Sequence, residues 1–407
     1  MTILHKLFVQ AHARYTRSPH VEDLAAFAQW FLDHDYSPRY AQRHVRKAMR
    51  VLEGLGVPSG SRWTSAQLDR AFRPFWRHLW YRRARHTFGA FLEAVGRLAP
   101  PQDHNPHAPV LAAYRCYVAE VRGLVPTTNV QHLAEARALL RHALPHGESL
   151  EHLTAAVVER YIQQRARGVS RRTLRTRIGY LRAFLRYCYD RHLIKTRLDL
   201  LEQPMGFRFE QPPRAIDWPS IQKLLSSIDR TDRSGWRDFM MLYLIAHYGL
   251  RPGEVTRLTV DSINWEDRTL LVEQPKTHSW LTLPLSDEAI SLLRRYLQEG
   301  RHQQRRTLLF TATRAPFHPV HTSTMTCLFK TRARKASLPI AHESPYALRH
   351  SFAMRLFGRG VGIKTIGDLM GHNSLASTCV YLRLQTEVLR EVALPVPRTV
   401  VLSGGAA

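Results

Sequence analysis

The stretch Tyr346-Ala-Leu-Arg-His-Ser-Phe352 and the stretch Gly371-His-Asn-Ser-Leu-Ala-Ser-Thr378 decide how the C-terminal half of this sequence is interpreted. The second stretch continues to Tyr381, which follows Arg349 by 32 residues. A third motif, Gly249-Leu-Arg-Pro-Gly-Glu254, lies upstream, and its arginine precedes Arg349 by 98 residues. Each motif is short and could arise by chance. In combination, their order and spacing are specific, so we treat them as parts of one domain.

The residues before and after the first motif predict two consecutive helices. Arg237 to Tyr248 has the pattern of a buried helix, and Gly249 is expected to end it. Pro252 suits the first turn of the next helix, which carries Glu254. We expect Glu254, one turn beyond Arg251, either to hold that arginine or to be an ordinary surface acid.

A small antiparallel sheet is predicted next. Short β-like runs at Thr269–Glu273 and Trp280–Leu285 are separated by a turn, and Lys276 lies at its tip. From Asp287 to Val392 the pattern is mostly helical. The C-terminal domain is therefore expected to be mainly α with one small sheet.

Together these motifs resemble the catalytic domain of tyrosine recombinases, also called phage-type integrases. That family carries, in order, an arginine, a lysine in a β-turn, His-x-x-Arg, Gly-His and a nucleophilic tyrosine. The resemblance covers about 220–385 and extends to 106–205 as the family's helical core-binding domain. It implies site-specific breakage and rejoining of DNA through a covalent 3′-phosphotyrosine, in integration, excision or mobile-element recombination. It also implies a tetramer on paired DNA sites, with no cofactor, metal or ATP.

The resemblance assigns roles that agree with the chemistry of each residue type. Arg251 and Arg349 would clamp the phosphate oxygens, because guanidinium groups form paired hydrogen bonds to them. Lys276 would protonate the leaving oxygen, a role for which arginine holds its proton too tightly. His372 would bind the phosphate or move a proton. Tyr381 would be the nucleophile, helped by nearby cations because a free phenol is a weak one.

One position departs from the family pattern. Tyr346 stands where a histidine usually precedes the second arginine by three residues. Both positions share one helical face, so Tyr346 can still offer a hydrogen bond, although it cannot cycle a proton near neutral pH. His350 is next to Arg349 but on a different side of the helix, so it is not expected to substitute.

The composition favours a polyanionic partner. Lysine and arginine total 59 against 33 acidic residues, a formal charge of +26. Basic groups that neutralise phosphates release counterions, so double-stranded DNA is the favoured partner and an anionic membrane surface the competitor. The four scattered cysteines suggest reduced thiols in a cytoplasmic protein. The sequence contains no nucleotide-binding motif and no metal-ligand spacing.

Stretches rich in proline and glycine divide the chain. They lie around 99–109 and 203–219 and predict domains at 1–105, 106–205 and 206–395, with a mobile tail at 396–407. The N-terminal half is expected to be all-α and to contain two related SAM-like helical domains. The segment 1–105 goes beyond the minimal family architecture.

A weak repeat supports that relation between the two N-terminal segments. Ser37 and Ser170 each precede an amphipathic run, and apolar residues after them match at a constant offset of 133. The second run carries a stripe of arginines that is expected to follow a DNA groove: Arg171, Arg175, Arg182 and Arg186. In the first run the basic stripe, formed by Arg39, Arg43, Arg46 and Arg50, lies on a different face.

Two other functions are compatible with the sequence. One is a DNA-binding accessory subunit that has lost full activity, with Tyr346 as the symptom. The other is a type IB topoisomerase, which shares the chemistry. Neither the target DNA sequence nor a need for partner recombinases follows from the sequence.

Overall fold

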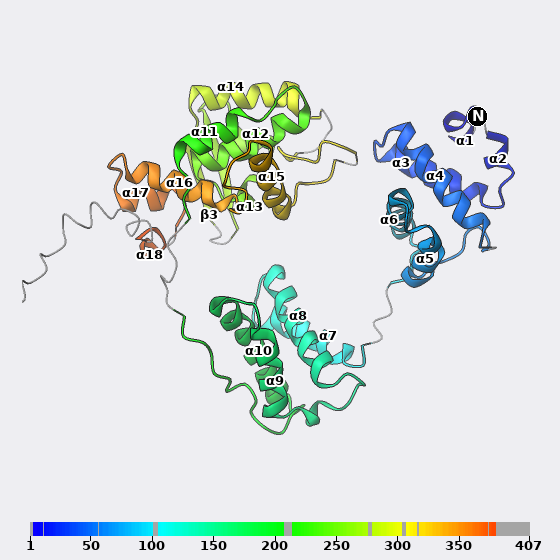
Figure 1. Cartoon of the computed structure of the whole chain (residues 1–407), viewed down its shortest axis with the longest axis horizontal. Coiled ribbons are helices and arrows are strands. Elements are labelled where there is room, and N and C mark those ends of the chain that lie inside the picture. The colour runs from blue at the N-terminus through cyan, green and yellow to red at the C-terminus, as the bar shows by residue number, and fades with distance from the viewer. Residues whose placement is uncertain are drawn as a thin grey trace, which may run out of the picture. The chain divides into compact units, whose positions relative to one another are not determined.

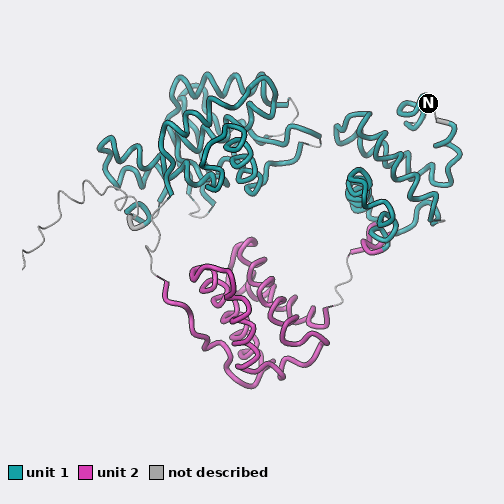
Figure 2. The backbone as a smooth tube through the Cα atoms, viewed as in Figure 1, with its two compact units in different colours: residues 1–62, 67–97, 211–407 teal, residues 63–66, 98–210 magenta. Residues whose placement is uncertain are grey.

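The computed structural model describes residues 3–10, 12–55, 57–100, 105–206, 214–275, 279–302, 307–315, 317–372 and 374–379. The chain divides into two compact units (Figure 2). One contains residues 1–62, 67–97 and 211–407, and the other contains residues 63–66 and 98–210. The predicted tail at 396–407 lies outside the described residues.

The N-terminal segment is entirely helical in its described part (Figure 1). Its helices are α1 (Ile3–Leu7), α2 (His12–Thr16), α3 (Val21–Asp33), α4 (Pro38–Glu53), α5 (Ser65–Phe72) and α6 (Leu79–Ala94). Helix α4 packs against α3 and α6. Phenylalanine rings fill the space between α3 and α6. The centroid of the Phe27 ring lies 4.7–5.2 Å from those of Phe31, Phe88 and Phe91.

The next segment is a second helical bundle. It contains α7 (Ala108–Cys116), a wider turn at Tyr117–Val121, α8 (Pro126–Ala143), α9 (Ala155–Ala166) and α10 (Arg171–Asp190). Its core is formed by apolar residues of all four helices, among them Tyr114, Leu139, Val158 and Phe184. The mainly helical architecture predicted for the N-terminal half is confirmed.

Both predicted helix caps are confirmed. The offset of 133, which matched the helix after Ser37 with the helix after Ser170, disagrees with how these helices pack. Ser37 accepts a hydrogen bond from Tyr40 N, and Ser170 accepts one from Thr173 N. However, α4 packs against both α3 and α6, as α8 packs against both α7 and α10, so α4 corresponds to α8 in its packing and not to α10. A serine cap followed by an apolar stripe is common to many amphipathic helices, so these features do not fix equivalence.

The C-terminal segment combines helices with the predicted sheet. Its helices are α11 (Trp218–Ser226), α12 (Arg233–Tyr248), α13 (Pro252–Val255), α14 (Asp287–Arg295), α15 (Thr322–Lys335), α16 (Tyr346–Phe357), α17 (Ile363–Leu369) and α18 (Leu375–Thr378). The strands β1 (Ile263–Asn264), β2 (Thr269–Gln274) and β3 (Ser279–Pro284) form an antiparallel sheet in that order. The predicted hairpin is confirmed, and β1 is an addition to it.

Helix α12 is the centre of the C-terminal core. It is almost wholly buried, and α11 and α16 pack against it. Asp232 caps it by accepting a hydrogen bond from Gly235 N, so it begins four residues before the predicted start at Arg237. Gly249 ends it in the left-handed conformation with φ 64°, as predicted.

Two further properties concern possible membrane-spanning helices and the state of the cysteines. No helix in the described ranges is long and apolar enough to cross a membrane. All four cysteines are free thiols.

Candidate active site

Arg349 is a deeply buried charged group of the predicted site. Its side chain is held in the first turn of α16, and the residue is only 4% exposed. The guanidinium donates to Gly249 O and, at 2.6 Å, to Met370 O. These carbonyls lie at the C-terminal ends of α12 and α17, where the helix dipole favours a cation.

Arg251 lies beside it and shares a carboxylate with it. Arg251 Nη1 donates to Glu254 Oε1 at 2.5 Å, and Arg251 N donates to Glu254 Oε2 at 2.7 Å. Glu254 Oε2 is also 3.8 Å from Arg349 Nη1. Glu254 is buried. Of the two predicted alternatives, it is therefore the acid that holds Arg251 and not an ordinary surface acid.

His372 completes the cluster. Its Nε2 is 3.2 Å from Arg349 Nη2, and its Nδ1 is 2.8 Å from Thr378 Oγ1. Because a guanidinium can only donate, Nε2 must accept, which places the ring proton on Nδ1. Burial lowers the pKa of His372 to about 4, and the positive charges of Arg349 and Arg251 add to this effect. The imidazole is therefore neutral at neutral pH.

Two glycines allow these groups to come together. Gly249 has φ 64°, and a Cβ there would collide with the ring of Phe352. Gly371 has φ 61°, and a Cβ there would collide with the side chain of Gln274. The backbone carbonyls that hold the arginines can therefore approach α16 and β2 only because both positions lack a side chain.

The two remaining predicted catalytic residues, Lys276 and Tyr381, lie outside the described residues. Their neighbours in the chain do reach the cluster. Gln274, two residues before Lys276, packs against Gly371. Thr378, three residues before Tyr381, contacts His372 and Gly367. The described parts of β2 and α18 therefore lead to the cluster from two sides.

Tyr346 and His350 differ in their surroundings. Tyr346 is the first residue of α16 and is 42% exposed. Its hydroxyl forms no hydrogen bond within the described part of the chain. His350 is half-buried, and its burial, followed by the charge of Arg349, lowers its pKa. The use of Tyr346 in catalysis stays a prediction.

The arginine stripe predicted on α10 has partners in its own chain. Arg182 Nε donates to Asp199 O at 3.1 Å, and Arg186 Nε forms an ion pair with the Asp199 carboxylate at 3.0 Å. Arg175 Nη1 is 3.5 Å from Gly206 O. The stripe thus holds the segment that follows α10, while Arg171, Arg175 and Arg186 remain exposed to solvent. Its predicted contact with DNA is not tested by these bonds.

Sequence reasoning missed two residues that shape the site. Gln274 is buried in phase with Leu270 and Val272, so the alternation along β2 indicates that it faces inward. Thr378 lies within the Gly371–Thr378 motif, but nothing in its spacing shows that it would bind His372. A contact of this kind, between residues six apart in the chain, depends on how α17 and α18 pack.

The site can bind an anion with two charged oxygens. Two guanidiniums and a neutral imidazole are gathered in a half-buried place, with one carboxylate to balance them. Such preorganised donors stabilise a phosphoryl transition state more strongly than donors in water would.

Comparison with known proteins agrees with this arrangement. A model described as "Phage integrase family" matches residues 216–387, and one described as "Phage integrase, N-terminal SAM-like domain" matches residues 111–192. The structure of XerH site-specific recombinase bound to palindromic difH substrate covers 90% of this chain and 92% of its own, with TM-score 0.54 and 16% identity. At that identity the likeness concerns the fold.

Two proteins of Sinorhizobium fredii resemble the sequence itself. "Putative integrase/recombinase y4rA" is 27% identical over 409 residues, which is 96% of this chain and 99% of that protein. "Putative integrase/recombinase y4gC" is 36% identical over 191 residues, which is 46% of this chain and 98% of that protein. With y4gC covered almost completely and both models matched, the chain belongs to the phage integrase family of tyrosine recombinases.

Proposed function

We propose that this recombinase cuts and rejoins double-stranded DNA through a covalent bond between Tyr381 and a 3′ phosphate. The observation that carries the proposal is one cluster of side chains, in which Arg251 and Arg349 share the Glu254 carboxylate and His372 contacts Arg349. These three side chains are contributed by separate motifs, and their donor groups match the needs of a phosphodiester under attack.

The proposed step exchanges one phosphate ester for another. The phenolic oxygen of Tyr381 attacks the phosphorus, and the bond from phosphorus to the 5′ oxygen breaks. Lys276 gives that oxygen a proton, so a free 5′ hydroxyl leaves. The phenolic proton passes to the medium or to His372, whose neutral ring is able to accept it. Rejoining is the reverse reaction with a 5′ hydroxyl from another strand, so neither step requires ATP.

The arginines act on the charge that develops in the transition state. Arg349 and Arg251 each have N–H groups that can turn from backbone carbonyls and Glu254 to the non-bridging oxygens. Tyr346, exposed at the start of α16, would donate one hydrogen bond to the same phosphate.

We further propose three domains, at 1–105, 106–205 and 206–395, and a tetramer on paired DNA sites. The 106–205 domain would bind the duplex, with Arg171, Arg175, Arg182 and Arg186 on phosphates. XerH, which shares the fold, is described bound to its difH substrate. The overall charge of +26 supports a nucleic-acid partner.

Adduct trapping tests the chemistry. The protein is mixed in EDTA with a nicked duplex from the DNA that flanks its gene, and products are separated on a denaturing gel. Wild type should form a protein–DNA adduct, and Tyr381→Phe should form none. Binding of the duplex without an adduct in wild type would contradict the proposal.

A second substrate isolates the role of Lys276. In a 5′-bridging phosphorothiolate the leaving group is sulfur, which departs without a proton. Lys276→Ala should therefore be slow on the ordinary duplex and fast on the sulfur duplex. Lys330→Ala, which changes a lysine outside the proposed site, should match wild type on both. Equal slowing of Lys276→Ala on both duplexes would remove the general-acid role.

A further inference from the structure

Helix α3 of the N-terminal segment and helix α7 of the next bundle share a short sequence motif and a pattern of burial. Leu24-Ala-Ala-Phe27 in α3 and Leu111-Ala-Ala-Tyr114 in α7 are 87 residues apart. The leucine and the aromatic residue are buried in both. Helix α3 packs on α4, as α7 packs on α8.

The next helices continue the match at a similar offset. Pro38 and Pro126 begin α4 and α8, and His44 and His132 follow each of them by six residues, an offset of 88. His44 Nδ1 is 2.8 Å from Thr87 Oγ1 in α6. The ring of His132 lies 4.5 Å from that of Tyr180 in α10, and Tyr180 is 93 residues after Thr87.

The remaining helices agree as well. In α6 and α10 the buried pairs Phe91-Leu92 and Phe184-Leu185 keep the offset of 93. Before α5 and α9, Thr64 and Thr154 are 90 residues apart, and the buried Leu68 and Val158 keep that offset. Offsets that change only between helices are typical of two copies with different loop lengths.

We infer that helices α3 to α6 of the N-terminal segment form a second copy of the helical domain at 111–192, and that a basic surface on α4 and α6 binds the phosphates of double-stranded DNA. The inference rests on the proposed function, because it concerns how the recombinase holds its DNA. We name this surface the α4–α6 face and define it by Arg39, Arg43, Lys47, Arg50, Arg82 and Arg83.

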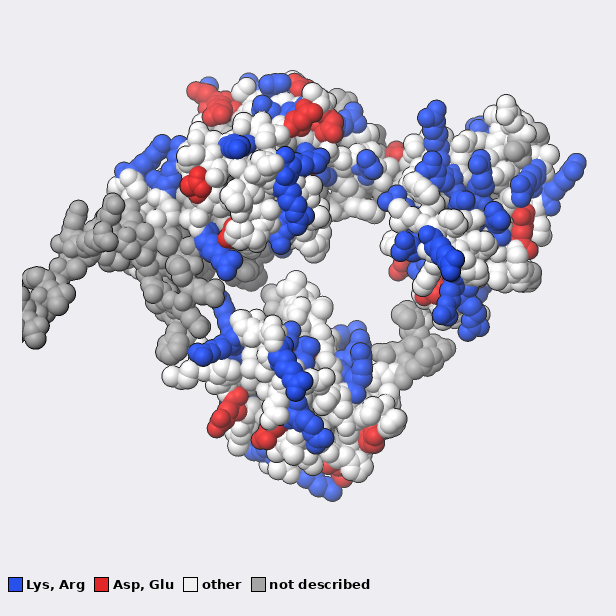
Figure 3. Space-filling view, in the orientation of Figure 1, with Lys and Arg blue, Asp and Glu red and all other residues white. Residues whose placement is uncertain are grey.

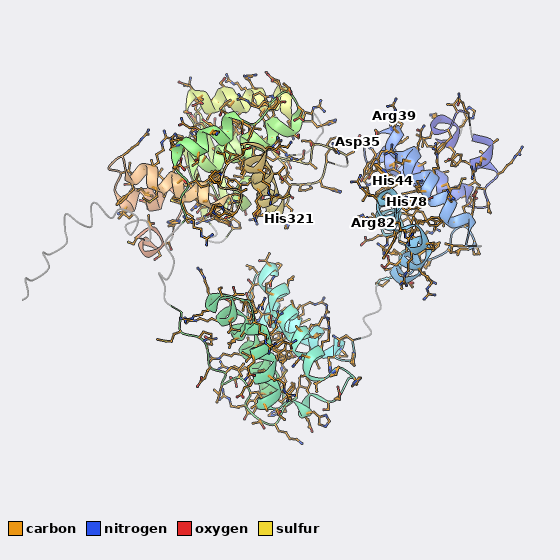
Figure 4. The ribbon with its side chains drawn as sticks, viewed as in Figure 1. Asp35, Arg39, His44, His78, Arg82 and His321 are labelled. Carbon is orange, nitrogen blue, oxygen red and sulfur yellow. The ribbon has the colours of Figure 1, made fainter. Side chains whose placement is uncertain are left out.

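The α4 part of this face is one continuous row. Arg39, Arg43, Lys47 and Arg50 follow each other at spacings of four, four and three residues, which place them along one side of a helix. All of them except Lys47, which is partly buried, are exposed. Figure 4 shows Arg39 and Arg82 along the same side of the domain.

Aromatic rings order the basic side chains. Arg43 and Arg83 lie over Trp80 at 4.1 and 4.9 Å, and Lys47 lies over Tyr81 at 4.5 Å. A stacked guanidinium keeps its N–H edge free, so it can bind a phosphate with less loss of side-chain entropy. Trp80 therefore joins the basic groups of α4 to those of α6.

The face lacks the acids that would neutralise it. Between Pro38 and Ala94 the sequence has 12 lysines and arginines against three acidic residues. Among the described residues, no carboxylate forms an ion pair with any member of the face. Basic side chains predominate on this segment in the view of Figure 3. The domain at 111–192 carries Arg175 at the position that matches Arg82, at the offset of 93.

The test measures how salt weakens the binding of the full chain to a long mixed-sequence duplex. Each lost phosphate contact lowers the slope of log K against log salt by about 0.9. The variant Arg39→Gln/Arg43→Gln/Arg83→Gln should therefore lower the slope by about 2–3. The matched control Lys6→Gln/Arg14→Gln/Arg17→Gln removes the same charge from exposed positions of the same segment and should leave the slope near that of wild type.

A charge-preserving variant separates binding from folding. Arg39→Lys/Arg43→Lys/Arg83→Lys should restore most of the slope, because lysine also binds phosphate. An unchanged slope in the glutamine variant would overturn the inference, and so would an equal loss in the control. Adduct formation on the nicked duplex is scored separately. If wild type forms no adduct but the slope still falls in the glutamine variant, the α4–α6 face stands and the role of Tyr381 fails.

Discussion

Arg251 and Arg349 are like charges that meet in a poorly solvated place, and their neighbours explain how the protein tolerates this. Glu254 supplies one buried negative charge to both. The carbonyls at the ends of α12 and α17 supply partial negative charge to Arg349 and Arg251. The result is a site with an excess of positive charge that a phosphate group can balance.

Glu254→Gln should weaken the site without removing a group that touches DNA. The glutamine amide has one uncharged oxygen where Glu254 has two charged ones that accept from Arg251, so the free energy of unfolding should fall by about 1–3 kcal/mol. Strand cleavage should slow, while affinity for the duplex should stay near that of wild type. Chemical denaturation and single-turnover cleavage measure the two effects. The exposed Glu266→Gln is the control, and a Glu254→Gln protein with normal stability and cleavage would refute the positioning role.

Tyr346 should contribute one neutral hydrogen bond to the transition state. Tyr346→Phe should then slow single-turnover cleavage about fivefold, the effect of roughly 1 kcal/mol. Tyr346→His should retain the rate of wild type or exceed it, because imidazole can also donate. If Tyr346→Phe cleaves at the wild-type rate, the hydroxyl has no part in the reaction.

At the scale of elements, the sequence predicted those turns and helix ends that depend on residues close together in the chain. The β2–β3 hairpin, the end of α12 at Gly249 and the caps at Ser37 and Ser170 all depend on residues close in the chain. The offset of 133 was wrong because cap and period do not identify a helix's place in a bundle. The arginine stripe on α10 was visible, but its bonds to Asp199 were not, since they arise from how the following segment turns back.

Gly249→Ala tests the junction of α12 and α16. The left-handed conformation and the contact with Phe352 should together lower the free energy of unfolding by about 2–4 kcal/mol. Gly253→Ala is the matched control, because a Cβ there would lie at an ordinary distance of 3.7 Å from Thr322 Oγ1. Similar unfolding curves for the two variants would show that the junction has room for a side chain.

At the scale of the whole molecule, three histidines predict that acid destabilises the fold: His44 is buried, and His247 and His372 are partly buried. Burial is the main cause that lowers the pKa of His44, His247 and His372 from 6.5 to about 4. The folded state therefore holds fewer protons than the unfolded chain between these values. The stabilisation is complete above pH 6.5 and is lost as the pH falls towards 4.

Thermal unfolding at steps of pH measures this dependence. The melting temperature should fall as the pH is lowered through that window, and His247→Gln should reduce the slope because one of the three groups no longer titrates. A melting temperature independent of pH across the window would contradict the burial of these rings as uncharged groups.

The order and spacing of the motifs predicted one site, and the structure brings Arg251, Arg349 and His372 together. The predicted places of Lys276 and Tyr381 lie outside the described residues. The sequence could not show that Glu254 is shared by both arginines or that Thr378 contacts Nδ1 of His372. These contacts join segments that are far apart along the chain or depend on the packing of short helices. They required the folded chain.

The central claim is that Tyr381 is the residue that becomes joined to DNA. The most direct test is to digest the trapped adduct with protease and nuclease and to locate the nucleotide by mass spectrometry. We predict a 3′ phosphate on the peptide that contains Tyr381. A nucleotide on Tyr346 or on any other residue, or an adduct that persists in Tyr381→Phe, would contradict the account.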